Sequence, residues 1–220
     1  MAFDFTIKQK LTGFALIVLV LLLSVGYSGY WGVRQLNQAM QVAVLDFSAL
    51  RNHMESDMMH DALRADVYVA LHAGPQASTA DKQAIRDALA EHVKRFKDNL
   101  INNDALPLDK GIKAALAEVR VPLDAYIRSA DRIVNLALTD SAMEAVQLNE
   151  FGAAFRALEV QMEKLGDRIE AANEQGMLSS RATVTTAEAT ILIFSSVAVL
   201  VSLLLAWLIP SQIGSSLRRI

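Results

Sequence analysis

The stretch FALIVLVLLL, from Phe14 to Leu23, lies inside a longer segment without any charged residue, from Leu11 to Val33. A helix needs about 20 mainly apolar residues to cross a bilayer. A second apolar segment runs from Ala189 to Ile209. The first segment is too long for the apolar region of a signal peptide, and no A-x-A-like cleavage site follows it. We therefore predict two transmembrane helices, the first of which is an uncleaved anchor.

Basic residues lie outside both apolar segments. Lys8 and Lys10 precede the first, and Arg218 and Arg219 follow the second. Because such residues stay on the cytoplasmic side, both ends are expected in the cytoplasm of a multi-pass protein of the bacterial inner membrane, surrounded by membrane lipid. The predicted parts are a cytoplasmic N-terminus (1–10), a transmembrane helix (11–33), a periplasmic sensor domain (34–188), a second transmembrane helix (189–209) and the start of a cytoplasmic linker (210–220).

Small residues recur at every fourth position in both predicted spans. Such a stripe lets two membrane helices approach each other closely. We expect packing contacts at Ser24, Ser28, Gly32, Ala198, Ser202 and Ala206.

The segment between the spans is rich in residues that favour helices, such as Ala, Leu, Glu and Gln. Three clusters of turn and capping residues interrupt it: Gly74-Pro75 with Ser78 and Thr79, Asn102-Asn103-Asp104 with Pro107 in the next first turn, and Thr139-Asp140-Ser141. The predicted helices are 34–73, 79–102, 107–138 and 141–188. Short connections make neighbouring helices antiparallel. The predicted fold is all-α, with two transmembrane helices flanking an antiparallel up-down-up-down four-helix bundle.

Apolar residues recur in steps of three and four along each predicted helix, which indicates coiled-coil-like seams. The seam of the first helix comprises Leu36, Met40, Ala43, Phe47, Leu50, Met54, Asp57, Asp61, Arg64, Tyr68 and Leu71. The other seams comprise Leu89, Val93, Phe96 and Leu100; Ile112, Leu116, Val119, Leu123, Tyr126, Ala130 and Ile133; and Leu148, Phe151, Phe155, Leu158, Met162, Leu165, Ile169 and Ala172. Pro122 is expected to kink the third helix. The first and fourth helices are the longest, and their uncovered apolar faces predict a homodimer.

Three charged residues interrupt the seam of the first helix, at Asp57, Asp61 and Arg64, with His60 beside them. Ionised groups are seldom buried without a partner. Two interpretations follow: an internal network in which Asp61 pairs with Arg64 and fixes the helix register, or a site that recognises a ligand or senses protons. Equal helix rise places Arg120 of the third helix near the same level. The candidate ligand-binding residues are Asp57, His60, Asp61, Arg64, Arg120 and Tyr126.

The composition and the motifs of the chain limit the classes of function that it can have. The chain has no cysteine, a net charge of −3, and neither a nucleophile–base pair nor a phosphate-binding loop. We therefore expect no enzyme, no cofactor and no nucleic-acid partner. Two minor alternatives stay open. Asp57, His60 and Asp61 could hold a metal ion, because they lie one helical turn apart, and His60 and His92 of the next helix could hold a haem.

The stretch DMMHDALRADV, residues 57–67, resembles a recurrent segment in the first sensor helix of methyl-accepting chemotaxis receptors. The tail IGSSLRRI, residues 213–220, is similar to the start of a HAMP domain, with Ser216 where such domains usually carry proline. The resemblance implies a homodimeric transmembrane chemoreceptor for a small periplasmic ligand, such as an organic acid, an amino acid or an amine. It also implies that the signal passes through the second span to a HAMP domain and a cytoplasmic region, beyond Ile220, that couples to the chemotaxis kinase and its coupling protein. The alternative is the sensor front end of a membrane histidine kinase or diguanylate cyclase.

Overall fold

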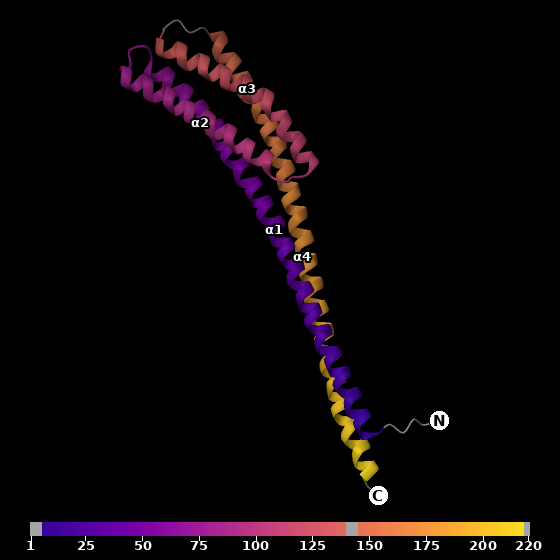
Figure 1. The fold of residues 1–220 in the computed structure, drawn as a ribbon. Coiled ribbons are helices and arrows are strands. Elements are labelled where there is room, and N and C mark those ends of the chain that lie inside the picture. The colour runs from indigo at the N-terminus through magenta and orange to yellow at the C-terminus, as the bar shows by residue number, and fades with distance from the viewer. Residues whose placement is uncertain (1–5, 140–144, 218–220) are drawn as a thin grey trace. The chain divides into compact units, whose positions relative to one another are not determined.

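The computed structural model describes residues 6–139 and 145–217, and these residues are helical apart from short connections. The four helices are α1 (Ile7–Ala73), α2 (Thr79–Ala105), α3 (Lys110–Thr139) and α4 (Ala145–Leu217), as Figure 1 shows. The described residues contain no strand. The predicted all-helical class is confirmed, and the predicted spans lie within the two longest helices rather than in helices of their own.

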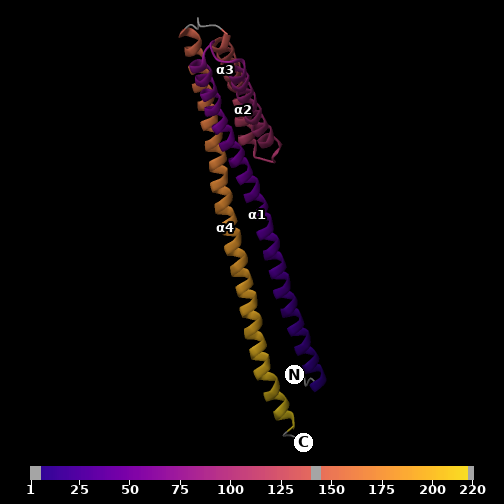
Figure 2. The same ribbon diagram turned by 90° about the vertical axis from the view of Figure 1, so that its left-hand side faces the viewer.

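The chain divides into two compact units. The first unit is formed by residues 1–41 and 177–220, and the second by residues 42–176. The second unit is the bundle, in which α2 and α3 lie alongside parts of α1 and α4 (Figure 2). Each unit is described separately below.

The core of the bundle unit is made of large apolar side chains from all four helices. Those with almost no exposed surface include Leu63, Val67, Phe96, Val119, Tyr126, Ile133, Leu158, Met162, Leu165 and Ile169. The seams predicted for α2, α3 and α4 therefore point inward, as expected from their 3–4 spacing. At the edge of these seams Leu148 is 39% exposed.

Most of the seam predicted for α1 is wrong within the bundle unit, although Leu50 and Leu71 do pack against the core. Its members Met54 and Tyr68 are 58% and 59% exposed, and Asp57 and Asp61 are exposed as well. The buried face of α1 instead comprises Ala49, Asn52, Ser56, Met59, His60, Leu63, Asp66, Val67 and Ala70. From Ala49 to Ser56 this face carries small and polar residues, and its large apolar side chains begin only at Met59. The longest run of large apolar residues at 3–4 spacing therefore lies on another face of the helix.

The connections between helices confirm one predicted cap and correct another. Ser78 is the N-cap of α2, because its Oγ accepts the backbone N–H of Asp81 at 3.1 Å. The second break lies later than predicted, since α2 continues to Ala105 and Pro107 falls in the loop before α3. Asp109 caps α3 instead, because its Oδ1 accepts the N–H groups of Gly111 and Ile112 at 2.6 and 3.1 Å.

Two further predictions concern the interior of α3 and the break that follows it. The helix α3 runs from Lys110 to Thr139 without interruption, with Pro122 in its interior. The third predicted break includes Asp140 and Ser141, which lie outside the described residues together with the rest of 140–144. Arg218 and Arg219, on which the predicted orientation depends, lie outside them too.

A buried amide pair fastens the C-terminal turn of α2 to α1. Asn103 has no exposed surface and Asn52 is 8% exposed. The Nδ2 of Asn52 donates to Oδ1 of Asn103 at 2.9 Å, and Nδ2 of Asn103 donates to the carbonyl oxygen of Ala49 at 3.1 Å. Because both amides have partners, they can be buried here without stranding a polar group.

Two glycines of α4 allow α1 to approach closely within the bundle unit. A Cβ at Gly166 would lie 2.8 Å from Nε2 of His53, and a Cβ at Gly176 would lie 2.7 Å from Oδ2 of Asp46. Real Cβ atoms do not come so close to other heavy atoms. Each glycine therefore leaves space for a polar side chain of α1, at some cost in helix propensity.

In the other unit, α1 and α4 each contain a stretch long and apolar enough to cross a membrane. The small-residue stripe of the first stretch lies where the helices meet: Ser28 is 5% exposed, and a Cβ at Gly32 would lie 3.2 Å from Cδ1 of Ile191. On α4 the buried small residue is Ala187, which is 8% exposed, whereas Ala206 of the predicted stripe is exposed.

Candidate functional site

His60 lies at the centre of an aromatic cluster that joins three helices of the bundle unit. Its side chain points into the core, where the residue is only 3% exposed. The imidazole stacks on Phe155 of α4, with ring centroids 4.1 Å apart, and meets Tyr126 of α3 edge-on at 5.2 Å. Its Nε2 is buried and has no hydrogen-bond partner among the described residues.

Burial lowers the pKa of His60 below its ordinary value, and this effect outweighs the nearby groups that oppose it. Those groups are the carboxylates of Asp61, Asp57 and Glu159 and a backbone hydrogen bond with Phe155. A neutral imidazole fits the site, because a proton on the unpartnered Nε2 would add a poorly solvated charge inside the bundle.

Tyr126 ties α3 to α1 at the same level. It has no exposed surface, and its hydroxyl donates to the backbone carbonyl of His60 at 2.9 Å. Burial raises the pKa of the Tyr126 phenol, with smaller opposing and reinforcing effects from Arg64 and Asp61. The phenol therefore stays protonated and acts as a structural donor.

Arg64 and Asp61 form the ion pair that the sequence allowed. The guanidinium Nη2 lies 2.8 Å from Oδ1 of Asp61, with side chains 41% and 63% exposed. At such exposure an ion pair contributes little to stability. The Arg64 Cζ also lies 4.4 Å from the centroid of the Phe155 ring, which is a cation–π contact. Arg64 therefore reaches from α1 to α4 while remaining accessible to solvent.

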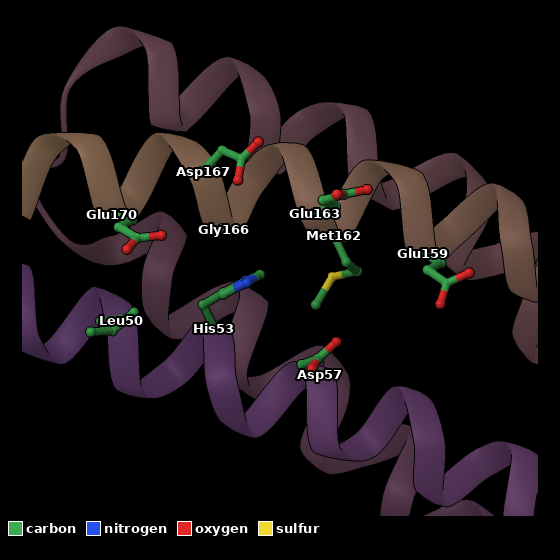
Figure 3. A pocket seen from close by; sticks show the side chains of 9 residues that line it. All are labelled: Leu50, His53, Asp57, Glu159, Met162, Glu163, Gly166, Asp167 and Glu170. Carbon is green, nitrogen blue, oxygen red and sulfur yellow. The ribbon is translucent and has the colours of Figure 1, made fainter.

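Asp57 lies apart from this cluster and lines a cavity of about 620 Å³ between α1 and α4. Figure 3 shows its nine lining residues: Leu50, His53, Asp57, Glu159, Met162, Glu163, Gly166, Asp167 and Glu170. Five of them are carboxylates and none is a lysine or an arginine. An organic acid entering this cavity would therefore meet five carboxylates, with His53 as the one lining residue that can carry a positive charge.

Arg120 does not join the predicted site. Its Nη2 lies 2.9 Å from Oδ2 of Asp104 on α2, on a solvent-exposed surface. It lines a smaller cavity between α2 and α3 with Lys97, Leu100, Ile101, Leu123 and Asp124. The level predicted for Arg120 is wrong: Tyr126 is the residue of α3 that meets His60, and Arg120, six residues before it, lies beside the end of α2. Equal rise along helices gives the right level only when the offset between the helices is known.

His92 has a different partner from the one a haem site requires. Its Nδ1 lies 2.6 Å from Oδ2 of Asp66, a residue that is 8% exposed. His60 meanwhile stacks on Phe155. Within the described residues, no group of three or more His, Cys, Asp or Glu side chains is arranged to hold a metal ion.

Four of the six predicted ligand-binding residues lie together in the structure, beside residues of α4 that the sequence did not identify as part of a site. His60, Asp61, Arg64 and Tyr126 lie together around Phe155, which the sequence presented only as a core residue. The acidic residues of the cavity do leave a sequence signal. They recur along one face of α4, at Glu159, Glu163, Asp167 and Glu170.

A family model described as a four-helix bundle sensory module for signal transduction matches residues 4–184. The match covers all of α1, α2 and α3, and residues 145–184 of α4. Comparisons with curated proteins and with solved structures give no match.

Proposed function

Because the chain belongs to the family of four-helix bundle sensory modules for signal transduction, we propose that it is the sensor portion of a transmembrane chemoreceptor. In this proposal the bundle lies in the periplasm, binds a small molecule there, and passes the signal across the inner membrane. The output passes through a HAMP domain to a cytoplasmic region that couples to the chemotaxis kinase.

The observation that carries this proposal is the continuity of α4. One uninterrupted helix, Ala145–Leu217, contains both the bundle face with Leu158 and Leu165 and the apolar stretch that can cross a membrane. A helix is stiff along its axis, so a displacement of α4 in the bundle is transmitted toward its far end without an intervening loop.

The exposed part of the polar cluster is the proposed point of ligand contact. Arg64 retains exposed surface and more N–H donors than Asp61 alone can occupy. Because Arg64 also contacts Phe155 of α4, a ligand that draws the guanidinium away would alter a contact between α1 and α4. His60 and Tyr126 are buried, so their role here is to position α1 rather than to touch the ligand.

We also propose that the functional unit is a homodimer. Large side chains recur at every seventh position of α1, and Met40, Phe47, Met54 and Tyr68 are 59%, 62%, 58% and 59% exposed. Asp61 occupies the fourth position of this series, between Met54 and Tyr68. A heptad of exposed apolar residues is the surface by which two parallel helices pair, and two copies in one membrane have parallel α1 helices.

The test is a fusion of residues 1–220 to the cytoplasmic signalling region of a chemoreceptor with known output. Cells carrying the fusion are exposed to organic acids, amino acids and amines, and kinase activity is recorded. We expect a response to at least one compound, abolished by Arg64→Ala and retained by Arg51→Ala, since Arg51 is exposed and pairs with Glu55 on the surface of the same helix. A correctly inserted fusion that responds to no compound, or an Arg64→Ala variant that responds normally, would contradict the proposal.

A further inference from the structure

The second histidine at the interface between α1 and α4 is His53, one heptad before His60. Its ring points from α1 toward α4 and ends against Gly166 (Figure 3). A Cβ at Gly166 would lie 2.8 Å from Nε2 and 3.5 Å from Cδ2 and Cε1 of this ring. The other ring nitrogen, Nδ1, is buried and has no hydrogen-bond partner among the described residues. The ring thus occupies a space that exists only because residue 166 is glycine.

Carboxylates surround this ring on one side. The cavity that His53 lines also holds Asp57 of α1 and Glu159, Glu163, Asp167 and Glu170 of α4 (Figure 3). Its remaining lining residues are Leu50, Met162 and Gly166, so no basic group besides His53 faces the cavity and neither α2 nor α3 contributes a residue. A positive charge formed on His53 would find its counter-ions in the adjoining cavity.

We propose that His53 is a proton sensor: the neutral ring stays seated against Gly166, and protonation moves it into the acidic cavity and loosens the contact between α1 and α4. The His53 ring then has two positions, one that favours its neutral form and one that favours its protonated form, and together they form a two-state element. The signalling consequence of this movement rests on the proposed sensory function. The titration of His53 and the movement of its ring do not depend on that function.

The seat against Gly166 favours the neutral ring. Burial lowers the pKa of His53 below its ordinary value, against the opposing influence of the Asp57 carboxylate. A protonated ring has two N–H donors that need acceptors, and its buried Nδ1 has none at the seat. The carboxylates of the cavity supply them, so acidification displaces the ring.

The other histidines of the chain lack this combination. His60 is enclosed by Phe155 and Tyr126 and does not line the cavity. His92 pairs with Asp66, and His72 is exposed near the end of α1. His72 therefore serves as a control position on the same helix.

The first experiment is an NMR titration of the histidine side chains in the full chain, reconstituted in phospholipid nanodiscs. We expect His53 to titrate at lower pH in the wild type than in Gly166→Ala, because the wild-type seat buries the neutral ring. In Gly166→Ala the new Cβ excludes the ring from its seat and so removes this burial. Gly152→Ala is the matched control, since its Cβ would meet only Nη1 of Arg156 at an ordinary 3.5 Å.

The second experiment measures the helix movement with spin labels at Arg51 on α1 and Lys164 on α4, both exposed residues. We expect the distance distribution to change between about pH 8 and about pH 5.5, the range in which histidine changes charge. His53→Gln, which keeps a neutral polar side chain, should remain in the high-pH distribution throughout. Gly166→Ala should show the low-pH distribution at both values, and His72→Gln should behave as the wild type.

Two results would overturn the inference: a His53 that titrates at the same pH in the wild type and in Gly166→Ala, or a pH-dependent distance change that persists in His53→Gln. Either result is independent of the fusion assay. If the distances change as expected but the fusion gives no output, the receptor assignment fails while the proton sensor stands. If the fusion responds to a small molecule but its pH response is unaltered by His53→Gln, the proton sensor fails and the receptor assignment stands.

Discussion

Replacing Asn103 with alanine should destabilise the bundle more than its small size suggests. The wild-type amide has no exposed surface, accepts a hydrogen bond from Asn52 and donates one to the carbonyl of Ala49. Alanine removes both bonds. It also leaves Nδ2 of Asn52 without its acceptor at a position that is 8% exposed, so a buried donor loses its only side-chain partner.

The expected magnitude follows from these contacts. Each lost hydrogen bond contributes about 0.5–1.5 kcal/mol, and a stranded buried donor costs about 1–3 kcal/mol. The side chain of Asn52 lies near the edge of the core, where water can recover part of the loss. The unfolding free energy should therefore fall by about 2–4 kcal/mol in Asn103→Ala. Asn52→Ala strands only an acceptor and should cost less.

The assay is urea unfolding of segment 34–188, followed by circular dichroism, with a cooperative wild-type transition as the reference. The double variant Asn52→Ala/Asn103→Ala should be more stable than the sum of the single losses predicts, by about 1–2 kcal/mol, because the two residues interact. Asn102→Ala, one residue away and exposed, should change stability by no more than about 0.5 kcal/mol. Additive losses, or equal losses at positions 102 and 103, would show that the amide pair does not fasten α2 to α1.

Three further outcomes are expected. Ser78→Ala removes the N-cap of α2 and should lower the unfolding free energy by about 1 kcal/mol, whereas Thr79→Ala should not. Burial lowers the pKa of His60, so the folded state binds fewer protons than the unfolded state. The free energy of unfolding should therefore fall as the pH drops below about 6.5. His60→Phe should show a smaller fall, and equal pH profiles of the variant and the wild type would refute this. Gly32→Val introduces a side chain where a Cβ alone would lie 3.2 Å from Cδ1 of Ile191. A disulfide engineered between the two membrane stretches should therefore form more slowly in this variant. Gly29→Val is the control, because nothing lies within 4 Å of its Cβ position.

The sequence predicts α2, α3 and α4 well because each has one apolar stripe. In α3 the stripe from Ile112 to Ile133 coincides with the buried face, since no second stripe competes with it. The breaks are predicted less well. Asn103 and Pro107 look like turn residues, yet Asn103 is a buried member of α2, because a partner on α1 satisfies its amide.

The sequence misleads at α1 because this helix has two faces with different partners. Periodicity detects the larger side chains, such as Phe47 and Met54, and these are exposed in a single copy of the chain. The face that packs in the bundle carries Ala49 and Ser56, whose small size suits a close approach but gives no apolar signal. Which stripe faces inward depends on the neighbouring helices, and this information is absent from one helix's own sequence.

The candidate site was predictable only in part for the same reason. A charged layer around Arg64 follows from local spacing, and so does its ion pair with Asp61. The contacts with Phe155, and the seating of His53 against Gly166, depend on how α1 and α4 align. That alignment follows from packing and cannot be read from either helix separately.

The two-faced packing of α1 is tested most directly by disulfide cross-linking of the full chain in membranes. The chain has no native cysteine, so single cysteines can be placed on each face in turn. Cross-linking between copies is expected at Met40, Phe47 and Met54, which are exposed in a single copy, and not at Ser56 and Leu63, which are buried in the bundle. Cross-linking at Ser56 or Leu63, or failure at all three exposed positions, would contradict the proposed homodimer and the assignment of the two faces.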